Sequence, residues 1–350
     1  MGLWDKSGAD VGNIKMKNSQ KLHDKLLAQL IPGRKVGIMS HVEPDGDGFA
    51  ASLALQLILK DRGLESEIIV DQDSHLERFA FLMEGASVLT YHEGMSYDLL
   101  IVLDCNSYSR VGERTGLIRD AGHVILIDHH VPENGIIKTD YSFVDISAAS
   151  AGAIVFRALQ SEIAALPEAL RIAVANCIYV TIINDTNNFI NANTNAEVFR
   201  IAAELCELGI SPAQLYKEYF LNHGALEMRY IGEVLSTIEL HNDGRVLYMY
   251  STLEMQARNK LTADSIMNIT RWVQGVRDID IIAYLREEKP GEYRLSLRSP
   301  RFDVNSVAVA YGGGGHVSAS GANLRGDLDS LKAELLGNLD RTLRNLPANA

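Results

Sequence analysis

Short apolar runs separated by helical patterns constrain the fold of this chain more than any other feature. Four such runs lie in its first half, at residues 36–39, 67–70, 99–103 and 124–127. Runs of this length, bounded by turn residues, are typical of parallel strands that are buried on both faces. Between the first two, Phe49 to Arg62 carries apolar residues at helical spacing and ends before Gly63. The pattern predicts a doubly wound α/β domain.

The second half of the chain has a different order of elements. Residues 195–235 are helical in pattern. Strand patterns follow at residues 245–251, 279–287 and 292–299, and a closing helix is expected at residues 327–343. We expect a helical linker and then a smaller α/β domain, with the active site in the cleft between the two domains. The prediction places a flexible extension at residues 1–18 and a catalytic domain at residues 19–205. The linker follows at residues 206–235, and the substrate-binding domain at residues 236–350.

Composition excludes several classes of protein. With 350 residues, 47% hydrophobic and 22% charged, the chain is long enough for two globular domains. It has neither a bilayer-length apolar run nor the charged-then-apolar order of a secretory signal, so we expect a soluble, cytoplasmic protein without membrane contact. The net charge of −12 argues against a sequence-independent grip on long duplex nucleic acid.

Acidic and histidine side chains follow or interrupt these apolar segments. They are His41, Asp45 and Asp47 in HVEPDGDG, Asp104 in LLIVLDCNS, the tripeptide Asp128-His129-His130, and Asp185 in TIINDTNNF. Because the carboxyl ends of parallel strands share one edge of a sheet, these side chains are expected to converge on one crevice.

Each motif also has an ordinary structural explanation when it is taken alone. HVEPDGDG is also typical of an acidic surface turn, and Asp104 is well placed to cap a following helix. Asp128-His129-His130 fits a solvated loop, and Asp185 fits a cap or turn after a long apolar helix. The coincidence of four motifs favours the shared site.

Charge compensation then indicates metal. Asp45, Asp47, Asp104 and Asp185 would bring four negative charges into one crevice, which requires protons or cations. Two divalent ions supply the four positive charges. Carboxylate and imidazole donors without thiolates suit Mn²⁺, Mg²⁺ or Co²⁺, and the available imidazoles favour Mn²⁺.

The order of these motifs, ending in GGGGH at residues 312–316, resembles the DHH phosphoesterase superfamily over about residues 19–350. The branch that it most resembles is the stand-alone oligoribonuclease and pAp phosphatase group, the nanoRNases. The resemblance implies a metal-dependent phosphodiesterase that hydrolyses short oligoribonucleotides, pAp, or linear and cyclic dinucleotides by two-metal activation of water.

The resemblance also implies roles for individual residues. His41 and Asp45 would hold one ion, and Asp104 would bridge to a second ion held by Asp47, His129 and Asp185. Asp128 would orient its neighbour His129, as metal-bound histidines usually require. His130 would face the substrate phosphate and stabilise charge or protonate the leaving oxygen, so His130, Asp104 and Asp128 are the catalytic candidates.

The second domain is expected to hold the rest of the substrate. The resemblance assigns a phosphate grip to Arg298, and successive glycines offer backbone N–H groups to an anion. The substrate-binding candidates are Arg298, Gly313, Gly314, Gly315, His316 and, from the first domain, Arg110. A surface or ion-paired role is the ordinary alternative for Arg110.

Two other functions stay open at this stage. A family II inorganic pyrophosphatase would share the metal ligands, but its second domain would carry a basic SRKKQ-like motif, which GGGGH replaces here. A catalytically silent nucleotide-binding module would keep the fold without turnover. The expected partners are short RNA oligonucleotides or small nucleotides, and a homodimer is left open. The preferred substrate, the cleavage polarity and the metal used in cells are not fixed by the sequence.

Overall fold

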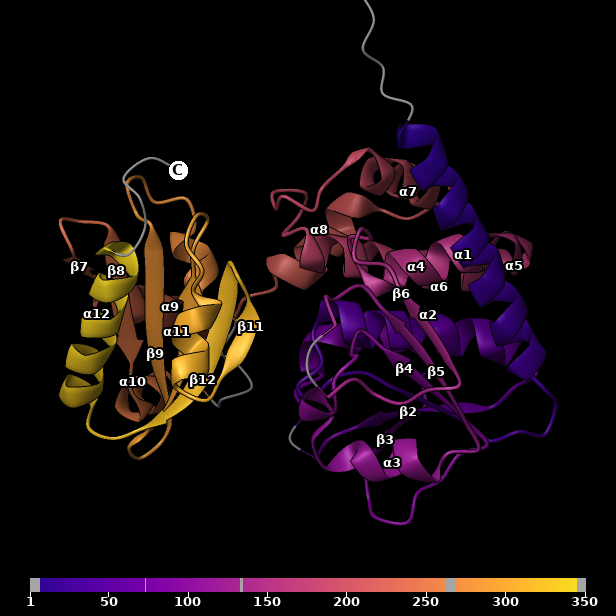
Figure 1. Cartoon of the computed structure of the whole chain (residues 1–350), viewed down its shortest axis with the longest axis horizontal. Coiled ribbons are helices and arrows are strands. Elements are labelled where there is room, and N and C mark those ends of the chain that lie inside the picture. Colours follow the sequence, from indigo (N-terminus) through magenta and orange to yellow (C-terminus); the bar gives the residue numbers. More distant parts are fainter. Residues whose placement is uncertain (1–6, 73, 133–134, 262–268, 345–350) are drawn as a thin grey trace, which may run out of the picture. The chain divides into compact units, whose positions relative to one another are not determined.

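The computed structural model describes residues 7–72, 74–132, 135–261 and 269–344, which form two compact units that divide after Asn222 (Figure 1). Each unit has its own six-stranded sheet. Within the described ranges, no helix has both the length and the apolar content that crossing a membrane requires. The predicted linker contains α8 (Pro212–Phe220) and α9 (Ala225–Leu235), which belong to different units. The domain boundaries expected from the sequence stay predictions.

The first unit is built on a parallel sheet with the order β3-β2-β1-β4-β5-β6. All of its paired neighbours run parallel. Its strands are β1 (Val36–Met39), β2 (Ser66–Val70), β3 (Val88–Thr90), β4 (Leu99–Leu103), β5 (His123–Asp128) and β6 (Tyr141–Val144). The doubly wound prediction is confirmed, and the four predicted runs coincide with β1, β2, β4 and β5. The short β3 and β6 were not predicted, because neither is a long apolar run.

Two apolar layers enclose this sheet. The larger core contains side chains from α2 (Gly46–Asp61), α4 (Ala151–Ala158), α6 (Glu168–Asp185) and α7 (Ala196–Glu207). The opposite face is covered by the short α3 (Thr115–Asp120) and by the loops around it. Figure 1 shows α2 and α3 on opposite sides of the strands. Burial on both faces explains why β4 is apolar at every position.

The sequence determines where helix α2, which carries part of the site, begins and ends. Asp45 caps its first turn, because one carboxylate oxygen accepts the backbone N–H groups of Asp47 and Gly48 at 2.9 and 3.2 Å. The helix ends before Gly63, whose φ of +70° glycine adopts readily. The helix begins at Gly46 and not at the predicted Phe49.

Helix α1 (Ser7–Gln29) departs from the sequence prediction. The expectation of a flexible extension over residues 1–18 does not hold from Ser7 onward, and residues 1–6 lie outside the described part of the chain. Leu22 and Leu26, one helical turn apart, are both buried in the larger core. The helix is therefore anchored to the first unit by its second half.

The second unit contains a mixed sheet with the order β11-β12-β10-β9-β8-β7. Its strands are β7 (Glu239–His241), β8 (Val246–Ser251), β9 (Ile281–Lys289), β10 (Glu292–Arg298), β11 (Gly314–His316) and β12 (Ala319–Arg325). Helices α11 (Asn305–Ala310) and α12 (Leu328–Arg344) contribute to the core on one face. Helix α9 and η5 (Ile269–Val273) contribute to the core on the other, and α10 (Leu253–Arg258) contacts α9 and β9. The predicted smaller α/β domain is confirmed.

The glycine segment of this unit contains an edge strand. Gly314–His316 forms the edge strand β11, which pairs antiparallel with β12. A Cβ at Gly313 would lie 2.1 Å from the carbonyl oxygen of Gly321, and one at Gly315 would lie 2.6 Å from that of Ala319. Glycine is therefore required here by the close approach of β12. The proposed anion binding by these N–H groups stays a prediction.

Candidate metal centre

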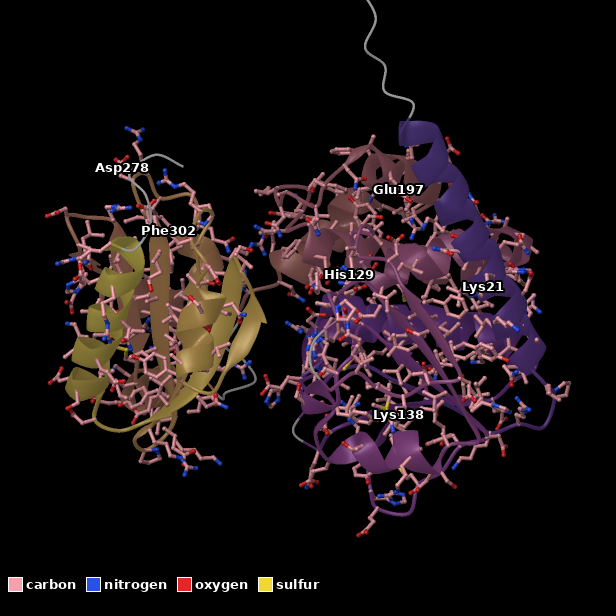
Figure 2. The ribbon with its side chains drawn as sticks, in the orientation of Figure 1. Lys21, His129, Lys138, Glu197, Asp278 and Phe302 are labelled. Atoms are coloured by element: carbon pink, nitrogen blue, oxygen red, sulfur yellow. The ribbon has the colours of Figure 1, made fainter. Side chains whose placement is uncertain are left out.

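The predicted ligands lie at the carboxyl edge of the parallel sheet. Leu103 of β4 pairs with Ile127 of β5, so the next residues, Asp104 and Asp128, come side by side. The edge includes the point between β1 and β4 where the strand order reverses, which is where open α/β sheets bind ligands. Figure 2 marks this region by His129.

One group of candidate ligands consists of His41, Asp45 and Asp104, with ligand atoms within 4.8 Å of one another. His41 Nε2 lies 3.7 Å from Asp45 Oδ1 and 3.5 Å from Asp104 Oδ2. His41 Nδ1 is 2.6 Å from the carbonyl oxygen of Val42. Since a ring N–H that donates to a carbonyl leaves the other nitrogen as a lone-pair donor, Nε2 is the atom suited to a metal.

A second group consists of Asp47, His129 and Asp185, again within 4.8 Å. His129 Nε2 lies 3.0 Å from Asp185 Oδ2 and 3.5 Å from Asp47 Oδ2. It also lies 3.3 Å from Asp104 Oδ1. The two oxygens of Asp104 therefore face different groups, Oδ2 toward His41 and Oδ1 toward His129.

Asp128 contacts a different histidine from the one that the resemblance implied. Its Oδ1 lies 2.8 Å from His130 Nδ1, and it accepts the backbone N–H groups of His129 and His130 at 2.7 and 3.1 Å. The expectation that Asp128 orients the ring of His129 is therefore corrected, since the imidazole that it contacts is that of His130. His130 Nδ1 also lies 3.2 Å from Asp104 Oδ1.

Asp47 is held by the first turn of α4. Its Oδ2 accepts the backbone N–H of Ala151 at 2.6 Å, and its Oδ1 accepts that of Gly152 at 3.0 Å. These N–H groups would otherwise lack partners at the start of a helix. The fully buried carboxylate is thus fixed by backbone donors from a distant part of the sequence.

The glycines of HVEPDGDG serve packing more than backbone freedom. A Cβ at Gly48 would lie 2.8 Å from the Cβ of Ser40, and one at Gly46 would lie 2.2 Å from the Tyr219 hydroxyl. Both glycines belong to the first turn of α2, which follows the loop after β1.

Two acidic motifs contain residues with left-handed backbone. Asp104 has a φ of +56°, a conformation that Asp and Asn adopt more readily than most residues. After Asp185, residues Asn187, Asn188 and Phe189 have φ values of +46°, +55° and +66°. Asp104 thus leaves β4 with a backbone conformation that a strand does not have, whereas the second turn follows the end of α6 at Asp185.

Several buried polar atoms of the cluster have no hydrogen-bond partner among the described residues. They are His41 Nε2, Asp104 Oδ1, Asp128 Oδ2 and His129 Nε2. Leaving such atoms unsatisfied in a protein interior is costly, so each is expected to have a partner in the working protein. Oxygen and imidazole nitrogen atoms around Asp104 fit the donor set of divalent cations such as Mn²⁺.

The pKa values of the carboxylates also indicate that the cluster needs positive charge nearby. Burial raises the pKa of Asp47, and the charges of Asp104 and Asp185 raise it further. Burial acts in the same direction on Asp104, but contacts with His129, His130 and His41 hold its pKa well below the usual range. The cluster therefore accommodates its negative charges only with cationic partners.

The nearby carboxylates raise the pKa values of the histidines. Burial lowers the pKa of His41, but Asp104 and Asp45 outweigh it and raise the pKa to about 10. In the same way, Asp104 and Asp185 raise the pKa of His129 to about 12 against burial. Without metal, protonated imidazoles would supply the charge that divalent cations supply when bound, so proton release is expected to accompany metal binding.

Sequence reasoning missed the part played by Asn184 and Tyr219. Asn184 Nδ2 lies 2.7 Å from Asp185 Oδ1 and 3.2 Å from Asp45 Oδ2, and the Tyr219 hydroxyl donates to Asn184 Oδ1 at 2.6 Å. The only sequence signal was the polar Asn184 next to Asp185. Nothing local marked Tyr219, which comes from α8.

The other predicted substrate residues lie in two places. Arg110 belongs to η2 (Tyr108–Arg110), and its carbonyl oxygen accepts the N–H of Val42 at 2.8 Å, which ties it to the loop after β1. In the second unit, Arg298 ends β10 and pairs with Ala319, which also pairs with His316. Burial lowers the pKa of Arg298, with a further contribution from Arg294. The side chain of His316 lies outside the described part.

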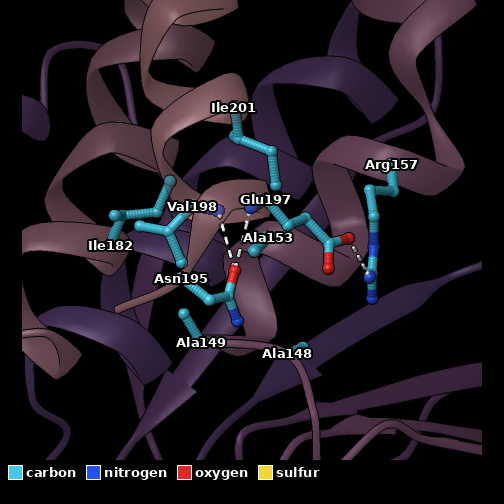
Figure 3. A pocket seen from close by; sticks show the side chains of 9 residues that line it. All are labelled: Ala148, Ala149, Ala153, Arg157, Ile182, Asn195, Glu197, Val198 and Ile201. Carbon is cyan, nitrogen blue, oxygen red and sulfur yellow. Dashed lines mark hydrogen bonds and ion pairs between the residues drawn. The ribbon is translucent and has the colours of Figure 1, made fainter. Parts of the chain in front are cut away.

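A pocket elsewhere in the first unit has a different character. Figure 3 shows its lining, which comes from Ala148, Ala149, Ala153, Arg157, Ile182, Asn195, Glu197, Val198 and Ile201. Asn195 caps α7 by accepting the N–H groups of Glu197 and Val198, and Arg157 pairs with Glu197 at 2.5 Å. Its polar groups thus serve the structure, and none of the predicted ligands lines it.

Comparisons with known proteins agree with these observations. The model described as DHH family, N-terminal domain matches residues 35–182, and the DHHA1 domain matches residues 243–345. The bifunctional oligoribonuclease and PAP phosphatase NrnA of Thermus thermophilus is 33% identical over 305 residues, 85% of this chain and 87% of that protein. The chain belongs to the DHH family. The resemblance inferred from the motifs is confirmed.

Other relatives of this DHH-family chain cover most of its length. The NrnA protein of Mycoplasma genitalium is 29% identical over 292 residues, 82% of this chain and 88% of that protein. The crystal structure of an exopolyphosphatase-related protein from Bacteroides fragilis has 25% identity and a TM-score of 0.81, and covers 93% of this chain and 96% of that one. The DHH and DHHA1 matches fall in the first and second units respectively.

Proposed function

We propose that this chain is a phosphoester hydrolase that cleaves short oligoribonucleotides and related nucleotides such as pAp. Asp104 carries the proposal, because its two oxygens face two separate groups of candidate metal ligands. Paired cations are a recurring solution to phosphate ester hydrolysis. The names of the Thermus and Mycoplasma relatives, oligoribonuclease and PAP phosphatase, support this class of substrate.

The proposed metal ligands are those expected from the sequence, with Mn²⁺ as the first choice and Mg²⁺ or Co²⁺ as alternatives. One set is His41, Asp45 and Asp104, and the other is Asp47, His129, Asp185 and again Asp104. When bound, two divalent cations lower the pKa of a water and offset the charge on the phosphoryl oxygens. Asp104 then serves to keep the two sets at a fixed separation.

We propose that His130 protonates the oxygen of the leaving group. Asp128 holds its Nδ1 at 2.8 Å, and the two residues lie directly beside Asp104. With Nδ1 so engaged, Nε2 is the atom from which a proton passes to the departing oxygen. Asp128 is fully buried and is itself fixed by two backbone N–H groups, so it orients the ring.

The proposed role of the second unit is to bind the remainder of the nucleotide. Arg298, Gly313, Gly314, Gly315 and His316 are the candidates there, and Arg110 is the candidate in the first unit. A guanidinium matches a phosphate with two parallel hydrogen bonds, which supports Arg298. The cleft between the domains, a cytoplasmic location and a homodimer stay predictions.

The test offers the purified protein with Mn²⁺ a panel of substrates: dinucleotides, longer RNA, pAp, cyclic dinucleotides and pyrophosphate. We expect mononucleotide release from the shortest RNAs. Asp104→Ala should remain folded and lose at least about 10³-fold in kcat, since it removes a ligand common to both sets. The matched control is Asp120→Asn, an exposed carboxylate paired with Arg119, which should keep full activity.

Two outcomes would replace the proposal. Fast release of phosphate from pyrophosphate, with nucleotides left intact, would make the chain a pyrophosphatase. Nucleotide binding without turnover in the wild-type protein would make it a silent binding module.

A further inference from the structure

One side-chain amide touches both groups of candidate metal ligands. Asn184 Nδ2 lies 2.7 Å from Oδ1 of Asp185, a member of the second group, and 3.2 Å from Oδ2 of Asp45, a member of the first. An amide nitrogen carries two hydrogens, so it can donate one to each carboxylate. Asn184 thereby links the end of α6 to the cap of α2 at the point where the two groups meet.

A tyrosine from a third helix holds the oxygen of this amide. The hydroxyl of Tyr219 in α8 donates to Asn184 Oδ1 at 2.6 Å, and the Tyr219 side chain is buried in the larger core. If the amide were reversed, its oxygen would face two carboxylates, which offer it no hydrogen. The two carboxylates therefore specify the orientation of Asn184, and the Tyr219 hydroxyl donates to the amide oxygen in that orientation.

The backbone of Gly46 packs closely against this pair. A Cβ on Gly46 would lie 2.2 Å from the Tyr219 hydroxyl and 2.8 Å from the Cβ of Asn184. Gly46 stands between Asp45 and Asp47, which belong to different groups. The amide and the hydroxyl thus fill the space left by a missing side chain in the first turn of α2.

We propose that Asn184 and Tyr219 form a positioning pair that fixes the carboxylates of Asp45 and Asp185 relative to each other, so that both cations bind with full affinity. The inference rests on the proposed metal centre. Partners that orient metal-binding carboxylates change metal affinity about 10- to 100-fold when they are removed. Because Asn184 donates to one carboxylate of each group, its loss should weaken both binding events.

The test measures Mn²⁺ binding to the metal-free protein by titration calorimetry, without substrate. Asn184→Ala should weaken both binding steps about 10-fold or more. Tyr219→Phe keeps the ring and removes only the hydroxyl, so we expect a loss of about 3- to 10-fold, the effect of one hydrogen bond. The double variant should bind Mn²⁺ as Asn184→Ala does, because the hydroxyl acts through the amide.

The matched control is Tyr179→Phe, which removes the hydroxyl of a buried tyrosine in α6, the helix that carries Asn184. It should bind Mn²⁺ like the wild type. Far-UV circular dichroism checks that every variant is folded. If Asn184→Ala does not fold, the Mn²⁺ affinity of Tyr219→Phe, compared with that of Tyr179→Phe, tests the inference in its place.

Different failures have different meanings. The positioning pair is overturned if the wild type binds two Mn²⁺ and Asn184→Ala binds them with the same affinity. If Asn184→Ala does not fold, unchanged affinity in Tyr219→Phe has the same meaning. Either result leaves the proposed function in place. A loss confined to one binding step, or additive losses in the double variant, also overturns the positioning pair. A wild-type protein that binds no Mn²⁺ overturns the proposed metal centre and the inference together.

Discussion

The carboxylate of Asp47 accepts a hydrogen bond from the backbone N–H of Gly152 at 3.0 Å, across 105 positions of sequence. Gly152 is also pressed against α6, since a Cβ there would lie 2.2 Å from Thr181 Oγ1. One residue therefore has to donate to a candidate metal ligand and to leave room for a neighbouring helix. Both requirements depend on the same close contact between α4 and α6.

Gly152→Ala should therefore destabilise the first unit. The added methyl group cannot be accommodated without moving α4 or the buried Thr181, so we expect the free energy of unfolding in urea to fall by about 1–3 kcal/mol. Gly232→Ala in α9 is the control, because nothing lies within 4 Å of its added Cβ. It should raise stability by about 0.5–1 kcal/mol. Equal effects of the two substitutions would show that Gly152 is not crowded.

Asp128→Asn should reduce kcat by about 100-fold or more, because His130 would lose the charged partner that fixes its ring. His130→Asn should have a comparable effect. The double variant should be hardly worse than either single variant, since the two side chains act as one unit. Steady-state kinetics on a dinucleotide would measure this, and effects that multiply in the double variant would refute the arrangement.

Removal of metal should lower the melting temperature of the wild-type protein. Asp47 is 0% exposed and Asp104 is 2% exposed, so their charges depend on nearby cations. A ligand at 100 times its Kd stabilises the folded state by about 2.7 kcal/mol. Calorimetric melts with a chelator and with excess Mn²⁺ would show the difference. Asp104→Ala should melt at nearly the same temperature in both, and a wild type that behaved likewise would contradict the prediction.

Stability should also depend on pH through His23, which joins α1 to α5 (Gln160–Ala165). Its Nε2 lies 2.9 Å from Glu162 Oε1, and hydrogen bonds with Asp24 and Glu162 raise its pKa. A histidine whose pKa is raised by folding contributes stability that is complete below the unfolded value of about 6.5 and is lost as the pH rises through the folded value.

We therefore expect His23→Gln to lower the free energy of unfolding more at about pH 5.5 than at about pH 9. Urea denaturation at the two pH values measures the difference. Glu162→Gln should remove part of the same pH dependence, because it takes away one of the two partners, Asp24 and Glu162, that raise the pKa. An identical loss in His23→Gln at both pH values would rule out this contribution.

Much of the first unit was predictable because burial on both faces leaves a plain signal. The strand that ends at Leu103 is apolar throughout, and Asp104 directly after it is costly to bury without a reason. The same logic located Asp128 at the end of β5 and Asp185 at the end of α6. Strand ends that share one sheet edge made the common site predictable from residues far apart in sequence.

What the sequence could not supply was the support of that site by tertiary contacts. The donors to Asp47 are backbone groups of α4, and the donor to the amide oxygen of Asn184 is a tyrosine in α8. Neither leaves a pattern in the local sequence. The packing of the glycine segment was hidden for a related reason. Only glycine fits at positions 313 and 315 because β12 passes close by, and the sequence does not distinguish such packing from a flexible loop.

The left-handed backbone at Asp104 has an evolutionary consequence. At a φ of +56°, most residues would be strained by about 1–2 kcal/mol, whereas glycine, asparagine and aspartate tolerate this backbone. A library randomised at this codon and selected only for folding in the absence of metal should therefore accept all three residues, whereas selection for turnover should retain aspartate alone. The residue found here in any descendant would reveal whether the carboxylate itself had been required.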